Sequence, residues 1–99
     1  MLEPITYLLA TEANRLCQIT AEATKFDEDG KPILWAVRRG STCLNRRTLE
    51  FDYEPMPSSR TAAYFKTHRF DSPQACEEIW IKAEAKEKRR IERFEKTEN

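Results

Sequence analysis

The sequence contains only one histidine, His68, and this scarcity bears on catalysis. Small enzymes that use general acid–base or nucleophilic chemistry need several activated groups close together, and histidine is the most common of them. His68 lies in a polar stretch between Thr67 and Arg69, and no motif pairs it with a cysteine or a serine. We therefore expect a protein that is not an enzyme and uses no cofactor, with His68 at the surface or only partly packed.

Cysteine is also scarce in this chain. The three residues Cys17, Cys43 and Cys76 are widely spaced, odd in number and without a Cys-x-x-Cys pattern. Isolated thiols of this kind suit a reducing cytoplasm, where they pack as small apolar side chains. They lack the spacing of zinc ligands, and residues 27–30 lack the alternating oxygen ligands of a calcium loop. We therefore expect no metal site.

Long apolar runs and an excess of one charge are absent as well. No run approaches the roughly 20 apolar residues that a membrane helix needs, and residues 1–4 lack the cationic start of a signal peptide. Lysine plus arginine number 17, as do aspartate plus glutamate, so the overall field does not attract nucleic acid. A chain of 99 residues has the usual size of one domain. We expect a single cytoplasmic domain without membrane contact, in which charge-based recognition is local.

Two segments alternate strictly between apolar and polar residues, which is the pattern of a half-buried strand. One covers residues 16–25, where every second residue from Cys17 to Ala23 is apolar. The other covers residues 49–54, where we expect the apolar residues to face the core and the carboxylates to face water. The apolar set is Leu49, Phe51 and Tyr53, and the acidic set is Glu50, Asp52 and Glu54.

A third strand is predicted over residues 32–39, because residues 33–37 are apolar on both faces, as in a central strand that a helix covers on one side and that is partly sheltered on the other. Asp29-Gly30 precedes it and supplies the positive φ of a tight reversal, so this strand forms a hairpin with residues 16–25. The apolar run at residues 5–10 has no defined period, and we favour a strand over a short helix. These segments predict an antiparallel meander of three or more strands.

Two helices are predicted after the strands. Pro55 and Pro57 end the β pattern, and serine caps then allow a short helix over about residues 60–66. Ser72-Pro73 marks the start of a long helix, whose apolar residues recur at helical spacing and pack on one face of the sheet. The fold class is therefore α+β, with an expected core of Ile19, Trp35, Val37, Phe51, Ile79 and Trp80.

The end of the long helix is almost entirely charged from residue 84 onward. We place the end of the domain at residue 85 and interpret residues 86–99 as a charged helical extension or a frayed tail. A cationic cluster that includes Arg89 and Arg90 is followed by Ile91 and Phe94, which are three residues apart. These residues suit a helix that binds a partner, and a solvated end is the alternative.

Two arginine pairs, Arg38-Arg39 and Arg46-Arg47, flank a short excursion between strands. In a meander both pairs can gather at one end of the sheet, near Arg60 or Arg69, and form a rim that binds phosphates. The alternative is that these arginines are solvated and balanced by neighbouring carboxylates. The candidate partner-binding residues are Arg38, Arg39, Arg46, Arg47, Arg60, Arg89, Arg90, Ile91 and Phe94.

Residues 34–40, 43–45, 54–60 and Phe70 together resemble small uncharacterised accessory proteins of bacteriophages and prophages. The resemblance implies a viral protein in a bacterial host cytoplasm, with an accessory role such as inhibition or redirection of a host nuclease or defence complex. The neutral net charge disfavours the acidic DNA-mimic form of this role. We expect a protein-binding inhibitor or modulator of a host protein, and the alternative is a small nucleic-acid-binding module that uses the arginine-rich loops.

Overall fold

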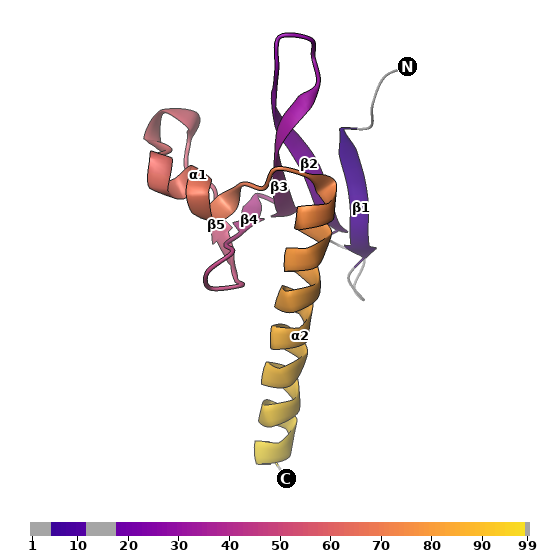
Figure 1. Cartoon of the computed structure of the whole chain (residues 1–99). Helices are drawn as coiled ribbons and strands as arrows, with labels where there is room; N and C mark the ends of the chain where they lie inside the picture. Colours follow the sequence, from indigo (N-terminus) through magenta and orange to yellow (C-terminus); the bar gives the residue numbers. More distant parts are fainter. Residues whose placement is uncertain (1–4, 12–17, 99) are drawn as a thin grey trace.

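The structure of the chain is a computed structural model that describes residues 5–11 and 18–98, with side chains described up to Arg90. Five strands form one antiparallel sheet in the order β1-β2-β3-β4-β5, and two helices follow them (Figure 1). This is the α+β meander, with a short and a long helix, that the sequence predicts. The elements are β1 (Thr6–Thr11), β2 (Gln18–Phe26), β3 (Pro32–Arg39), β4 (Thr42–Leu44), β5 (Phe51–Tyr53), the 3₁₀ turn η1 (Pro57–Ser59), α1 (Ala62–His68) and α2 (Pro73–Glu98).

The β2–β3 hairpin is closed by the turn that Asp-Gly predicts. The carboxylate of Asp27 accepts hydrogen bonds from the backbone N–H groups of Asp29 (2.9 Å) and Lys31 (2.8 Å). Gly30 has a φ of +79°, a left-handed conformation that glycine adopts without steric cost. The strand that follows this turn, β3, lies in the middle of the five, as its apolar composition predicts.

The strand register gives the sheet two unlike faces. Ala21 pairs with Val37 on the face that packs against α2, which we call the helix face. Arg38 pairs with Cys43 on the opposite face, which we call the arginine face. Successive residues of a strand point to opposite faces, so β3 contributes to both.

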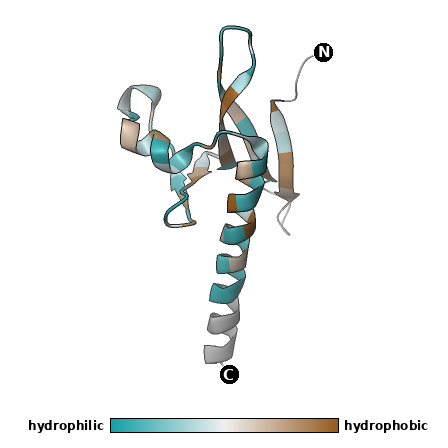
Figure 2. Cartoon of the chain, in the orientation of Figure 1, coloured by the Kyte–Doolittle hydropathy of each residue, from teal (hydrophilic) through white to brown (hydrophobic). Residues whose placement is uncertain are grey.

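The hydrophobic core lies between the helix face and the first half of α2. Four of the six expected core residues are buried, and the other two, Phe51 and Ile79, are partly buried and pack against them. Figure 2 shows hydrophobic residues on the strands and the early turns of α2, whereas the later coloured turns of α2 are mostly hydrophilic. The buried four are Ile19, Trp35, Val37 and Trp80.

Phe70 adds a short backbone pairing to this core. Its N–H and C=O each bond to Trp35, at 2.8 Å, along the part of β3 that β4 does not reach. The pairing holds the segment between α1 and α2 against the sheet. Both described cysteines, Cys43 and Cys76, are buried free thiols, as expected, and Cys17 lies outside the described residues.

Two residues of the segment 49–54 do not lie where the alternation places them. Tyr53 is 75% exposed, because it lies at the sheet edge, past the area that α2 covers. The side chain of Glu54 is only 6% exposed, because β5 ends at Tyr53 and the side chains of Tyr64 and Arg69 contact Glu54. The prediction of a core tyrosine and a solvated glutamate is therefore wrong.

The short helix begins two residues later than predicted. Thr61 is its N-cap, and its side chain accepts a hydrogen bond from the N–H of Tyr64 (3.2 Å). The serines expected to serve as caps, Ser58 and Ser59, belong instead to the 3₁₀ turn η1. The predicted capping chemistry is right in kind, but a threonine provides it.

The long helix α2 extends well beyond the sheet (Figure 1). At about 1.5 Å per residue, its 26 residues span about 39 Å. Ala83 is its last residue in the core cluster, and Lys86 and Arg90 still contact Glu50. No helix among the residues that the structure describes is long and apolar enough to cross a membrane.

Candidate functional site

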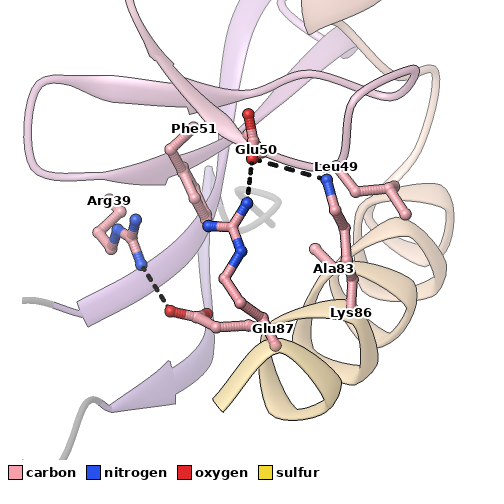
Figure 3. Close-up of a pocket in the computed structure, with 8 residues that line it drawn as sticks. Arg39, Leu49, Glu50, Phe51, Ala83, Lys86 and Glu87 are labelled. Atoms are coloured by element: carbon pink, nitrogen blue, oxygen red, sulfur yellow. Dashed lines mark hydrogen bonds and ion pairs between the residues drawn. The ribbon is translucent and has the colours of Figure 1, made fainter. Parts of the chain in front are cut away.

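A cavity of about 210 Å³ opens between α2 and the turn that leads into β5 (Figure 3), and we call it the helix cavity. Apolar side chains of Leu49, Phe51 and Ala83 line it. Ala83 is buried and the other two are partly buried, so these three form its floor. The remaining lining residues are charged and come from β3, from the turn and from α2.

The turn before β5 is built by one asparagine. The side-chain oxygen of Asn45 accepts hydrogen bonds from the N–H groups of Arg47 (2.8 Å) and Thr48 (3.3 Å). Its backbone oxygen accepts a further bond from Leu49 (2.8 Å), which has a positive φ of 60°. Non-glycine residues seldom adopt this conformation, and here it places Leu49 and then Glu50 beside α2.

Ion pairs form the rim of the helix cavity. Glu50 contacts Arg90 at 2.9 Å and Lys86 at 3.6 Å, and Arg39 contacts Glu87 at 4.0 Å. Figure 3 shows Lys86 directed at Glu50, and Arg39 directed at Glu87. Three basic and two acidic side chains line the cavity, so its rim carries one net positive charge.

Two further contacts fix the cations of the rim. The guanidinium of Arg39 lies 4.3 Å from the centre of the Phe51 ring, a cation–π geometry. The ammonium group of Lys86 donates a hydrogen bond to the backbone oxygen of Thr48. The cavity is therefore an apolar depression enclosed by charged side chains that are held in place. This arrangement suits the docking of a side chain better than it suits the making or breaking of covalent bonds.

A second polar centre lies on the arginine face, where Glu54 is shared by three arginines. Its carboxylate contacts Arg38 at 2.7 Å and Arg60 at 3.5 Å, and it accepts a hydrogen bond from Arg69. The hydroxyl group of Tyr64 donates a further bond to it at 3.2 Å. The side chain of Arg69 is only 2% exposed, so this cluster is part of the interior.

The charges of this cluster control the ionisation of its members. Burial alone would raise the pKa of Glu54, but the hydrogen bond and charge of Arg69, with the charges of Arg38 and Arg60, lower that pKa to about 2. Burial raises the pKa of the neighbouring Cys43 thiol. Glu54 is therefore a fixed anion, and Cys43 is a protonated thiol rather than a nucleophile.

His68 is buried, contrary to the expectation of a surface or partly packed residue. Its Nε2 lies 2.8 Å from Asp52, and its Nδ1 lies 2.6 Å from the hydroxyl group of Thr67. Its ring stacks on Tyr64, with the ring centres 4.2 Å apart. The hydrogen bond with His68 lowers the pKa of Asp52. Because both ring nitrogens have partners, the contacts of His68 serve to attach the last turn of α1 to β5.

The predicted arginine rim is distributed over both faces of the sheet. Arg38 lies on the arginine face with Arg60, whereas Arg39 lies on the helix face, since neighbouring residues of a strand alternate. Arg46 stacks over the ring of Phe70 at 4.8 Å and donates a hydrogen bond to the backbone of Arg69. The structure therefore brings Arg38 and Arg60 together, but it does not unite the two pairs.

The candidate residues of α2 have different surroundings. Arg90 lines the helix cavity, while Arg89 is exposed and its Nε donates a hydrogen bond to the backbone oxygen of Ala85, at 3.4 Å. The side chains of Ile91 and Phe94 lie outside the described residues. Sequence reasoning missed Lys86 as a site residue, because its contact with Thr48 joins positions 38 apart.

No protein-family model, curated protein or solved structure matches the chain. Within the described residues, no group of three or more histidine, cysteine, aspartate or glutamate side chains is arranged to hold a metal ion.

Proposed function

We propose that this chain is a non-enzymatic binding module of the phage accessory type, which holds a host protein at the helix cavity and along the projecting part of α2. The observation that carries the proposal is the apolar floor of the cavity, enclosed by ion pairs, at the point where α2 leaves the sheet. Interfaces of proteins commonly centre on an apolar anchor in a pocket, with charged residues around it.

The charges indicate the chemistry of the partner. Glu50 is the only acidic partner that Lys86 and Arg90 have among the described residues, and both cations share it. A carboxylate of a partner can therefore pair with one of them while Glu50 keeps the other. A partner segment with one apolar side chain and neighbouring acidic residues would match both the floor and the net positive rim.

The binding surface is proposed to continue along α2. In the sequence, Phe94 follows Arg90 by four positions, and a helix brings such positions to the same side. The resemblance to phage accessory proteins supports a bacterial host protein as the partner, such as a nuclease or a subunit of a defence complex. Inhibition or redirection of that host protein would be the outcome of binding.

The alternative function is binding of nucleic acid through the arginine-rich loops. The surroundings of the Arg38-Arg39 pair support it less than they support protein binding. Arg38 is paired with Glu54, and Arg39 is placed beside Glu87 and Phe51. Cations that already have acidic partners gain less from phosphate contacts. Arg46 differs from them, because its guanidinium lies over an aromatic ring rather than against a carboxylate.

Affinity capture from a bacterial lysate, with and without nuclease, tests the protein-binding proposal. The double variant Lys86→Gln with Arg90→Gln should lose the partner, because it removes two cations of the rim. The matched control, Lys82→Gln with Lys88→Gln, removes two cations elsewhere on the same helix and should retain the partner. Both double variants should melt close to wild type, since surface ion pairs contribute about 0–1 kcal/mol.

A second pair of variants tests the helical extension. Replacing Ile91 and Phe94 by serine keeps every charge and should weaken capture. If the partner is still captured by this variant and by the variant without the Lys86 and Arg90 charges, the proposed surface is wrong. A partner that disappears after nuclease treatment would instead favour the nucleic-acid alternative.

A further inference from the structure

A second cavity, of about 370 Å³, shares no residue with the helix cavity. It lies among α1, β3, the segment after β4 and the start of α2, and we call it the aromatic cavity. Its floor includes the buried ring of Phe70, and the partly exposed Phe65 and Leu34 form apolar walls. Ligand pockets commonly measure about 300–1,000 Å³, so this cavity suits a small ligand or one unit of a polymer.

The positive charges of the basic side chains in the aromatic cavity are only partly compensated by carboxylates. Arg46 and Lys66 have no carboxylate partner among the described residues, although both are exposed at the cavity. The guanidinium of Arg46 is oriented by the Phe70 ring and by the backbone oxygen of Arg69. Arg69 is paired with Glu54, a carboxylate that two further arginines share, and Asp71 is the only acidic side chain of the lining. Three basic and one acidic side chain line the cavity, so its lining carries an excess of positive charge.

We infer that the aromatic cavity binds one nucleotide unit of a single-stranded nucleic acid. A phosphodiester is negatively charged and complements the positive lining, in which Arg46 and Lys66 have no carboxylate partner among the described residues. Arg46 and Lys66 contact the phosphate, and the base lies against Phe65, a residue that is 39% exposed. Aromatic side chains beside cations are the usual means of binding single strands without strong sequence preference.

This activity would be separate from the protein-binding function, because the two cavities use different residues and different chemistry. A carboxylate of a protein could satisfy Arg46 and Lys66 as well, but it would leave the apolar wall of Phe65 and Leu34 without a planar partner. The base and the phosphate together fill both parts of the lining.

Fluorescence anisotropy with a labelled oligothymidylate tests the inference. The strand should bind, and affinity should fall as salt rises, because phosphate contacts release counterions. The double variant Arg46→Gln with Lys66→Gln should reduce the slope of log affinity against log salt by about 0.7, the contribution of one phosphate contact of a single strand. The control, Lys25→Gln with Lys82→Gln, removes two exposed cations outside this cavity and should leave affinity and slope unchanged.

Asp71→Asn provides an independent check, because it should strengthen binding by removing the only acidic group of the lining. This increase in affinity cannot arise from impaired folding. Competition with thymidine monophosphate distinguishes a site for free nucleotides from a site for a strand. Only a site for free nucleotides would be saturated by thymidine monophosphate at the concentrations at which the strand binds. The inference is overturned if the strand does not bind, if the control variant weakens binding equally, or if inorganic phosphate competes as well as thymidine monophosphate.

Discussion

Replacement of Glu54 by glutamine tests the role of the arginine cluster in stability. Glutamine keeps the shape of the side chain but removes its charge, which leaves Arg69 buried without an anion. Breaking a buried ion pair by removing one partner typically costs about 3–5 kcal/mol. The arrangement around Glu54 is therefore expected to contribute a large part of the stability of a domain of this size.

The pKa of Glu54 gives a second, independent value for the free energy by which its charge stabilises the fold. Its decrease from 4.5 to about 2 on folding corresponds to about 3 kcal/mol, and the side chain is almost fully buried. Because the folded-state pKa is below the unfolded value, this stabilisation is complete above pH 4.5 and is lost as the pH falls toward 2. Glu54→Gln should therefore lower the melting temperature by about 10–25 °C at neutral pH.

Urea denaturation of wild type and Glu54→Gln at several pH values measures this effect, with the fluorescence of the buried Trp35 and Trp80 as the signal. The gap in unfolding free energy should be about 3 kcal/mol at pH 7 and should narrow below pH 4.5. Glu22→Gln is the control, because Glu22 also contacts Arg38 but is 44% exposed. It should cost less than about 1 kcal/mol. A gap that is equally small for both variants, or that does not change with pH, would show that the Glu54 charge does not stabilise the fold.

Two further predictions concern the core. Trp80→Ala should lower the unfolding free energy by about 3–5 kcal/mol in the same urea assay, because it removes a buried ring that packs against Phe51. Cys76, whose pKa burial raises to about 12, and Cys43, whose pKa burial also raises, should react slowly with iodoacetamide in the folded protein. Peptide mass spectrometry should show both thiols reacting fast only after unfolding in urea, and rapid labelling of either in the native state would contradict the burial.

The fold was largely predictable because its main signals are local. The carboxylate of Asp27 and the positive φ of Gly30 act within one turn, and they define the hairpin without help from the rest of the chain. Ser72 accepts a hydrogen bond from the N–H of Ala75 (3.1 Å), as expected for the cap of a long helix that begins at Pro73. Apolar periodicity then decides which face of each element is buried.

The polar centres were not predictable in the same way. The alternation that assigns Phe51 to the core also assigns Glu54 to water, but this rule holds only as far as the strand, which ends at Tyr53. Beyond that point the position of Glu54 depends on Arg69, 15 residues later in the sequence. A contact of this kind depends on how α1 returns to the sheet, and no period in the sequence encodes that path.

Strand alternation also explains why the arginine pairs of the sequence do not form one surface. Arg38 and Arg39 are adjacent in sequence and therefore point to opposite faces of the sheet. Arg38 forms an ion pair with Glu54 on one face, and Arg39 forms one with Glu87 on the other. Both arginines of this pair are thus held by ion pairs within the chain. A cation is available for recognition where the fold leaves it without a nearby carboxylate, as at Arg46 and Lys66, or where one carboxylate serves two cations, as at the helix cavity. Which cations these are is decided by tertiary packing, so a count of charges along the sequence cannot identify the binding surfaces.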